Sequence, residues 1–342
     1  MPADVPISPN QTAIPLTDPE LAARLTQRLA LVESALHDAV ASTDALADDA
    51  SRHLVSAGGK LFRPLLVLLA GELGDGTRPE LVDAAVVVEL TQVASLYHDD
   101  VMDSAPVRRG APSAHTVWGN SVAILVGDLL FSRASSVVAG LGPEAVLIQA
   151  ATFERMCLGQ LHESLGPGEG ADQVEHYLQV LSDKTASLLA TSARFGAMFG
   201  GCTPEIVEAV AAYGEKVGVA FQLADDVLDI ASSATESGKT PGTDLREHVP
   251  TMPVLLLRSR VARGEAKPGD VELLALLDGD LSSDAVLADA VERMRAHEVV
   301  AQTRELAARW AHEAAAELTP LPAGPVRDAL DQFAAALADR AS

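Results

Sequence analysis

Residues 86–103 read VVVELTQVASLYHDDVMD, a long apolar stretch that closes on three aspartates. The same aspartate spacing returns over residues 217–229, which read VGVAFQLADDVLD. Residues three and four apart share a face of a helix, so each triplet turns its carboxylates the same way. Packing alone would not gather six like charges beside apolar runs. Hard divalent cations would offset the repulsion, since Mg²⁺ takes one or two carboxylates per ion and completes its shell with water and phosphate.

The plain alternative is a pair of acidic helix ends. A single triplet would be explained equally well by an acidic helix end or by a metal site. Two triplets after matching apolar runs favour metal binding. Ser104-Ala105-Pro106 follows the first triplet, and the residue before a proline resists helical geometry, so a helix should end there. Helix ends that open onto loops are accessible to a soluble ligand. The candidate metal ligands are Asp99, Asp100, Asp103, Asp225, Asp226 and Asp229.

The composition and the positions of Gly and Pro predict a single all-α domain. Hydrophobic residues make up 48% of the chain and aromatic residues 4%, which favours helices over sheets. Gly and Pro separate the helical segments, for example at Gly58-Gly59 and from Gly140 to Pro143, and no alternating strand pairs are visible. Residues 1–16 are rich in proline and are expected to be disordered, whereas residues 17–342 should form one domain. Thr17 or Asp18 should cap the first helix.

Charge and cysteine usage limit the partners and the compartment. The formal net charge of −23 repels nucleic acid and offers no attraction to anionic membrane surfaces. No uncharged apolar run reaches the roughly 18 residues of a membrane span, so we expect no transmembrane segment. Cys157 and Cys202 form neither a disulfide framework nor a zinc motif, which fits a reducing cytoplasm. Both thiols are expected to be packed in the core.

Positive charge is concentrated in a few short segments. Only five lysines occur against 20 arginines, so each lysine is a candidate for a specific role. Residues 58–64 read GGKLFRP, residues 108–110 read RRG, residues 184–185 read KT and residues 238–245 read GKTPGTDL. Guanidinium groups bind phosphate oxygens bidentately, and lysine acts as a point charge. Two metal-binding faces and two cationic patches therefore predict a site for two polyphosphate groups.

Taken in order, these motifs resemble those of the trans-isoprenyl diphosphate synthases, also called polyprenyl synthetases. The resemblance covers residues from roughly 20 to 340 and includes the pattern FQxxDDxxD over residues 221–229. It implies an isoprenoid-synthase-type helical bundle around a central cavity, normally as a homodimer. It also implies head-to-tail condensation of an allylic diphosphate with isopentenyl diphosphate, with about three Mg²⁺ ions per active site.

The resemblance also implies roles for individual residues. The aspartates would hold the Mg²⁺ ions that bind the allylic diphosphate, and Asp229 would act partly through water. The residues implied to bind isopentenyl diphosphate are Lys60, Arg63, Gln92 and Arg109. Those implied to bind the allylic diphosphate are Arg108, Lys184 and Lys239. The implied catalytic residues are Lys184, Thr185 and Gln222, of which Thr185 and Gln222 would stabilise a carbocation through their oxygen dipoles.

The expected mechanism follows from these charges. Metal ions and cationic side chains stabilise the negative charge on the departing diphosphate. The isopentenyl double bond attacks the resulting allyl cation, and the released diphosphate can accept the proton that is then lost. No Ser, Cys or His nucleophile is needed for this reaction.

Small residues precede the first triplet. Ala94 and Ser95 lie about 6–7.5 Å behind Asp99 along a helix axis, and Thr91 lies a turn deeper. In the family, small residues there let the growing chain descend. The resemblance therefore implies a product of about seven to ten isoprene units (about C35–C50), of the kind attached to respiratory quinones. Alternatively, Ala94 and Ser95 only pack against a neighbouring helix, and a deeper side chain sets the floor.

Several other functions share part of this pattern. A short-chain synthase that makes geranylgeranyl or farnesyl diphosphate is the nearest alternative. A non-catalytic partner subunit of a heteromeric synthase should have lost aspartates, and a class I terpene cyclase should have a different second metal motif. An acidic scaffold or Ca²⁺-binding protein would not explain the lysine placement, and the EF-hand loop is absent from the sequence. Transient contact with a membrane is compatible with the release of a strongly apolar product.

Overall fold

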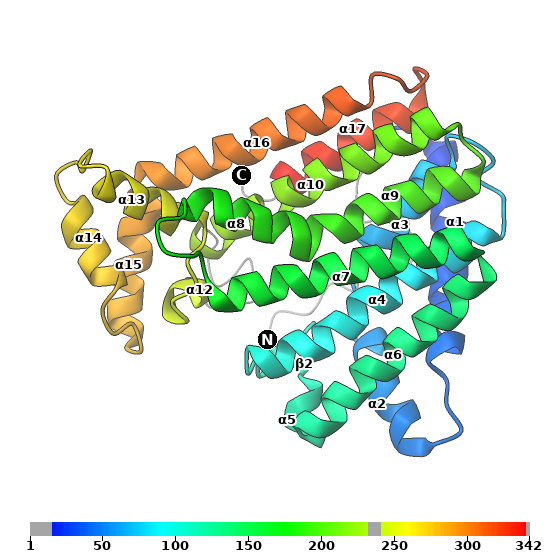
Figure 1. The fold of residues 1–342 in the computed structure, drawn as a ribbon, viewed down its shortest axis with the longest axis horizontal. Coiled ribbons are helices and arrows are strands. Elements are labelled where there is room, and N and C mark those ends of the chain that lie inside the picture. The colour runs from blue at the N-terminus through cyan, green and yellow to red at the C-terminus, as the bar shows by residue number, and fades with distance from the viewer. Residues whose placement is uncertain (1–15, 232–240, 340–342) are drawn as a thin grey trace. The chain divides into compact units, whose positions relative to one another are not determined.

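The computed structural model describes residues 16–231 and 241–339, most of them helical, and confirms the all-α prediction (Figure 1). Most of the segment expected to be disordered, and Lys239, lie outside the described residues. The helical elements are α1 (Pro19–Val40), α2 (Ala45–Ser56), α3 (Phe62–Gly71), α4 (Glu80–Met102), α5 (Ala114–Trp118), α6 (Asn120–Gly140), α7 (Pro143–Leu165), α8 (Gln173–Leu181), the π-helical turn η1 (Ser182–Ala186), α9 (Ser187–Gly200), α10 (Pro204–Ala231), α12 (Thr243–Arg246), α13 (Met252–Ala262), α14 (Asp270–Leu277), α15 (Asp284–Ala296), α16 (Glu298–Glu317) and α17 (Pro325–Ala338).

The chain forms two compact units that are interleaved in sequence. The first unit comprises Met1–Glu154, Leu188–Gly214 and Glu317–Gln332. The second unit comprises Arg155–Ser187, Glu215–Ala316 and Phe333–Ser342. Helices α7, α10 and α17 supply residues to both units. The single domain over residues 17–342 stays a prediction.

Helix ends fall where capping and helix-breaking residues predict them. Asp18 caps α1, since its Oδ1 accepts the N–H of Leu21 at 2.8 Å. Helix α6 ends at Gly140 and α7 begins at Pro143. The sequence did not predict the short antiparallel pair β1 (Val107–Arg108) and β2 (Ala111–Pro112), because two-residue strands are too short to show alternation.

The first unit buries α3 and α4 most deeply. Helix α3 is buried from Pro64 to Gly71, and α4 packs against α1, α3 and α6. Figure 1 shows α4 and α6 running side by side. The backbones of α9 and α3 lie in direct contact at Gly196. A Cβ atom there would lie only 2.2 Å from the carbonyl oxygen of Val67. This tight packing fixes α4 and the triplet at its end.

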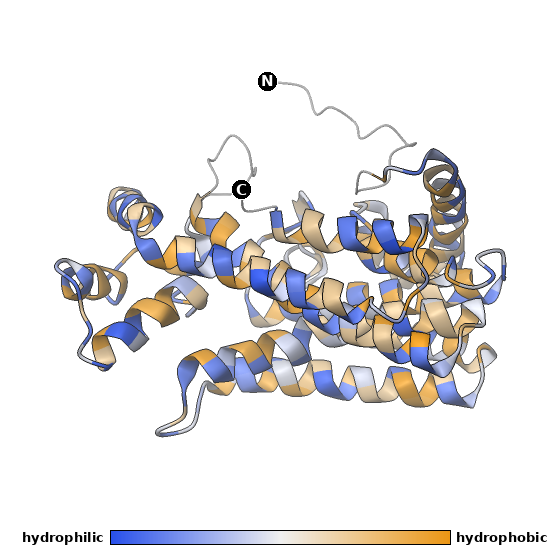
Figure 2. Cartoon of the chain, turned by 90° about the horizontal axis from the view of Figure 1, so that it is seen from above, coloured by the Kyte–Doolittle hydropathy of each residue, from blue (hydrophilic) through white to orange (hydrophobic). Residues whose placement is uncertain are grey.

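The second unit has an aliphatic core around the last turns of α10. Its buried members include Val227 and Ile230 of α10, Leu257 of α13 and Met294 of α15. A neighbouring cluster joins Leu181 and Ala186 to Leu223 and Met252. Figure 2 shows hydrophilic and hydrophobic residues alternating along most helices, as expected for helices that bury one face.

The two cysteines are less buried than the sequence predicts. Cys157 is exposed and Cys202 is only half-buried, so the prediction that both thiols are packed in the core is wrong. Within the described residues, only α6 is long and apolar enough to cross a membrane; 33% of its most apolar stretch is buried, and it packs along α4. The absence of a transmembrane segment stays a prediction.

Candidate active site

The first aspartate triplet occupies the last turn of α4. Asp99 is half-buried, Asp100 is fully buried, and Asp103 is exposed at the C-cap. The Nε of Arg108 donates to Oδ1 of Asp100 at 2.6 Å, whereas Oδ2 of Asp100 is buried without a hydrogen-bond partner. Burial raises the pKa of Asp100, and the ion pair with Arg108 opposes that rise. One carboxylate oxygen of this triplet is thus available to a cation.

The turn between β1 and β2 places Arg109 beside α4. Arg109 has a left-handed φ of 52°, and its Nη1 donates to the carbonyl of Leu54 at 3.1 Å. Its Nη2 donates at 3.0 Å to Oε1 of Glu89, a buried carboxylate on α4. A Cβ atom on Gly59 would lie 3.1 Å from Cζ of Arg109, so the GGK loop passes directly over this guanidinium.

Arg63 belongs to the same charged group. Burial lowers the pKa of Arg63 to about 10; the carboxylate of Glu89 raises it, and the positive charge of Arg109 lowers it further. Two guanidiniums near one carboxylate keep a net positive charge. A cavity of about 430 Å³ borders this group and is lined in part by Gly58, Gly59 and Arg109. Of the two other residues predicted here, Lys60 is exposed with Nζ 5.9 Å from the centre of the Phe62 ring, and Gln92 is half-buried on α4.

The second triplet lies in the last turns of α10. The buried carboxylate of Asp226 accepts the hydroxyl of Tyr177 at 2.9 and 3.0 Å, and the backbone N–H of Met252 at 3.1 Å. Burial raises the pKa of Asp226 well above its usual range, although both donors lower it. Asp225 is half-buried, and so is Gln222 one turn before it.

Asp229 connects α10 to the segment after it. Its Oδ2 accepts the N–H of Asp244 at 3.3 Å, and its carbonyl accepts the N–H of Gly242 at 2.8 Å. The described part of GKTPGTDL is therefore attached to the second triplet. Lys239, from the same motif, lies outside the described residues.

The π-helical turn η1 carries both Lys184 and Thr185. Both side chains are half-buried, and Nζ of Lys184 forms an ion pair with Glu163 of α7. In the second unit, η1 is also part of the cluster that holds Met252, whose N–H binds Asp226. Lys184, Thr185 and the second triplet thus belong to one packed unit.

The donor atoms fit a hard divalent ion. The triplets offer only carboxylate oxygens, and Oδ2 of Asp100 accepts no hydrogen bond. Across residues 16–231 and 241–339, however, no three Asp, Glu, His or Cys side chains converge to hold an ion by themselves. Any ion here would need water or phosphate oxygens to complete its shell, as Mg²⁺ commonly does.

The residues expected to control product length line α4 behind Asp99. Ala94 and Thr91 are buried, and Ser95 is half-buried. Thr91 donates to the carbonyl of Val87 at 2.8 Å, so its hydroxyl is satisfied within the helix. The aromatic ring of Tyr97 is fully buried, and its hydroxyl donates to the carbonyl of Ala50 in α2. Tyr97 therefore points toward α2.

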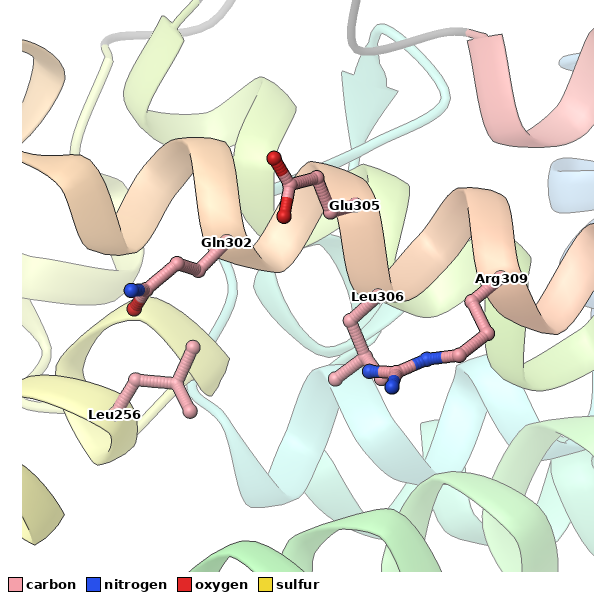
Figure 3. A pocket seen from close by; sticks show the side chains of 5 residues that line it. All are labelled: Leu256, Gln302, Glu305, Leu306 and Arg309. Atoms are coloured by element: carbon pink, nitrogen blue, oxygen red, sulfur yellow. The ribbon is translucent and has the colours of Figure 1, made fainter.

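Three residues of these sites were missed in the sequence. Glu89 interrupts an apolar run, and a lone carboxylate in such a run is a usable signal for a buried ion pair. Tyr177 and Arg155 gave no such signal, because their partners lie 27 or more residues away in the sequence: Tyr177 binds Asp226, and Arg155 of α7 binds Ser182, Asp183 and Glu215. A further cavity of about 450 Å³ lies between Leu256 of α13 and Gln302, Glu305, Leu306 and Arg309 of α16 (Figure 3). None of the predicted site residues lines it.

The chain resembles known proteins over most of its length. Residues 44–294 match the polyprenyl synthetase family. The chain is 44% identical over 318 residues to a nonaprenyl diphosphate synthase from Mycobacterium tuberculosis, with 93% of each protein covered. It is 34% identical to heptaprenyl diphosphate synthase component 2 from Geobacillus stearothermophilus, with 91% of this chain and 95% of that protein covered.

A solved structure shows a similar fold. It is geranylgeranyl pyrophosphate synthase from Corynebacterium glutamicum, complexed with calcium and isoprenyl diphosphate. The two chains align with a TM-score of 0.83 and 39% sequence identity, over 96% of this chain and 99% of that one. These proteins differ in the chain length that their names state.

Proposed function

Because the chain belongs to the polyprenyl synthetase family, we propose that it condenses isopentenyl diphosphate with an allylic diphosphate to make a long-chain all-trans-polyprenyl diphosphate. It is a prenyltransferase, and its product has about seven to ten isoprene units (about C35–C50). The quinone side chain is the proposed destination of that product.

The aspartate triplets bind the allylic diphosphate through Mg²⁺. Their oxygen-only donor set and the unpartnered Oδ2 of Asp100 support this role, as does the calcium named in the Corynebacterium glutamicum complex. When bound, Mg²⁺ supplies Lewis-acid stabilisation of the departing diphosphate. We propose about three ions, with Asp229 acting partly through water. Arg108 opposes the rise that burial causes in the pKa of Asp100, and it binds the same diphosphate.

Isopentenyl diphosphate is bound by the charged group around Glu89. Arg109 binds this carboxylate and Arg63 interacts electrostatically with it, so the two guanidiniums leave a net positive charge that attracts a diphosphate. Lys60 adds a third cation from the GGK loop, and Gln92 adds an amide. Gly59 brings the GGK loop close to Arg109, since a Cβ atom there would lie 3.1 Å from Cζ of Arg109.

The reacting centre is served by η1 and α10. Lys184 exchanges its partner Glu163 for the allylic diphosphate, and Lys239 binds the same group. Thr185 and Gln222 direct oxygen dipoles at the developing allyl cation, a form of electrostatic stabilisation that preorganised dipoles provide well. The released diphosphate takes the proton lost after carbon–carbon bond formation.

Small buried side chains behind Asp99 are the observation that carries the long-chain proposal. Ala94 and Thr91 are small and buried on α4, and Tyr97 is turned toward α2. The name of the 39%-identical structure favours a second candidate, synthesis of geranylgeranyl diphosphate. Incubating the purified chain with farnesyl diphosphate, isopentenyl diphosphate and Mg²⁺ distinguishes them, with the dephosphorylated products sized by chromatography.

The expected products of that assay have about C35–C50 chains. Accumulation of geranylgeranyl diphosphate alone would support the second candidate. Absence of both product and released diphosphate would overturn the proposed enzyme activity. Omission of Mg²⁺, with a chelator present, should abolish turnover.

We also propose a homodimer in the cytoplasm. The free cysteines agree with a reducing compartment, and exposed leucines on α6 and α7 offer an apolar surface to a second copy. The heptaprenyl relative is named as one component of its synthase, which keeps a heteromeric assembly as the alternative. Transient contact with a membrane could serve product release.

A further inference from the structure

The π-helical turn η1 is held in place by a network that the reaction chemistry does not use. A π-turn contains one residue more per turn than an α-helix and is often found at functional sites. If that extra residue were lost, the residues after it would rotate by about 100° around the helix axis. Since η1 carries Lys184 and Thr185, its register decides where these side chains point.

Arg155 of α7 is the centre of this network. Its Nε donates to Oδ1 of Asp183 at 2.9 Å, and its Nη2 donates to Oγ of Ser182 at 3.1 Å. The same guanidinium binds Glu215 of α10 bidentately, at 2.6 and 3.1 Å. The hydroxyl of Ser182 also donates to Glu215. Arg155 therefore joins the first two residues of η1 to α10 from the side of α7.

Two glycines bring the neighbouring backbones against the same turn. A Cβ atom on Gly159 of α7 would lie 2.5 Å from the backbone nitrogen of Lys184. A Cβ atom on Gly218 of α10 would lie 2.4 Å from Cα of Ala186. Both distances are shorter than any real Cβ contact. The turn is thus enclosed between α7 and α10, with Arg155 on one edge.

A single exposed ion pair would add little, typically about 0.2–1 kcal/mol. Arg155 differs from such a pair, because its guanidinium is bidentate to one carboxylate and binds two further groups in consecutive residues. Planar, multiply bonded guanidinium groups of this kind fix geometry, which lysine cannot reproduce.

We infer that Arg155, through Glu215, is a positioning residue that holds η1 in the register presenting Lys184 and Thr185 to the allylic diphosphate. This inference rests on the proposed function, because it assigns the allylic substrate to Lys184. Arg155 itself contacts no substrate in this account. It binds η1 through Ser182 and Asp183, and Glu215 of α10 anchors its guanidinium.

Arg155→Ala, Arg155→Lys and Glu215→Gln test the inference. Arg155→Ala should raise the KM for the allylic diphosphate about tenfold and lower kcat, while the KM for isopentenyl diphosphate changes less than about twofold. Arg155→Lys should recover only part of the loss, because lysine cannot bind Glu215 bidentately. Glu215→Gln keeps the side-chain shape, and its KM for the allylic diphosphate should lie between those of Arg155→Ala and wild type.

Arg194→Ala is the matched control. Arg194 also binds a glutamate, Glu208, through both terminal nitrogens, but it touches no part of η1. Its KM values should equal those of wild type. Binding of inorganic pyrophosphate with Mg²⁺, measured by calorimetry without turnover, should weaken about tenfold in Arg155→Ala and not in Arg194→Ala.

Each outcome decides the question. Equal rises in both KM values, or no rise in either, would overturn the positioning role. So would full rescue by Arg155→Lys. If wild type itself makes no prenyl product, the proposed function fails instead, and pyrophosphate binding still tests whether Arg155 orders η1.

Discussion

Ala94 is the residue at which a single side chain should change the product. It is fully buried five positions before Asp99 on α4. Ala94→Phe should shorten the product distribution, because a bulky ring there would block the growing chain. Overpacking of a buried site commonly costs about 1–3 kcal/mol, so urea unfolding must accompany the assay. An unchanged chain-length distribution in a folded variant would contradict the role of Ala94 as the floor.

Asp270 gives a pH-dependent prediction in the second unit. Its Oδ2 accepts the N–H of Lys267 at 2.9 Å, and Nε2 of His297 lies 3.1 Å from Oδ1. Burial alone would raise the pKa of Asp270, but these partners and Arg260 hold it below the ordinary 3.8. A carboxylate with a depressed folded-state pKa stabilises the fold above its unfolded pKa. That contribution is lost as the pH falls through the folded-state pKa.

Asp270→Asn should therefore lower the free energy of unfolding by about 1–3 kcal/mol at neutral pH. At about pH 3, below the ordinary pKa of an aspartate, the difference from wild type should shrink, because Asp270 of the unfolded chain then binds a proton that the folded state binds less readily. Both pH values avoid the isoelectric point near 4.6, where aggregation is favoured. Asp278→Asn, at an exposed ion pair with Arg258, should change little. An equal Asp270→Asn difference at both pH values would contradict this assignment.

Sequence patterns identified the charged residues better than their partners. The aspartate triplets and the GGK and RRG motifs were visible because each is local. Asp226 was predicted as a metal ligand, but its hydrogen bonds from Tyr177 and Met252 join residues 49 and 26 positions apart. No spacing rule predicts such contacts, since they depend on how helices pack. Glu89 is the exception, because a carboxylate inside an apolar run is already unusual.

At the scale of helices, starts and stops were predictable and the π-turn was not. Asp18, Gly140 and Pro143 mark helix ends through their own backbone preferences. Residues 182–186 read SDKTA, which differs in no obvious way from an α-helical segment. The turn is instead imposed by its neighbours, above all by the close approach of α7 at Gly159.

Gly159→Ala tests this imposed geometry. The new methyl group would lie 2.5 Å from the backbone nitrogen of Lys184, so backbone must move. We expect a loss of about 1–3 kcal/mol in the free energy of unfolding, with reduced turnover. Gly140→Ala, at the end of α6 with nothing within 4 Å, should be neutral or slightly stabilising. Equal stability of the two variants in urea unfolding would show that η1 is not constrained at Gly159.

At the scale of the whole molecule, contacts within one chain do not explain the exposed leucines of α6 and α7. Leu125 of α6 is 65% exposed, and Leu147 and Leu165 of α7 are 71% and 74% exposed. Leu147, Leu158 and Leu165 lie 11 and 18 residues apart, which places them on one helical face at 3.6 residues per turn. Exposed leucines that share one helical face often mark an interface.

Leu147→Glu should convert the proposed homodimer to a monomer, because a charge would be buried without a partner at the interface. Wild type should sediment at twice the 35.6 kDa chain mass, and Leu147→Glu should sediment near the mass of one chain. Leu31→Glu, at an isolated leucine of α1 that is 53% exposed, should leave the wild-type mass unchanged. A Leu147→Glu protein that still sediments as a dimer would place the interface elsewhere. Monomeric wild type would instead refute the homodimer, and it would leave the apolar face of α7 to a different partner.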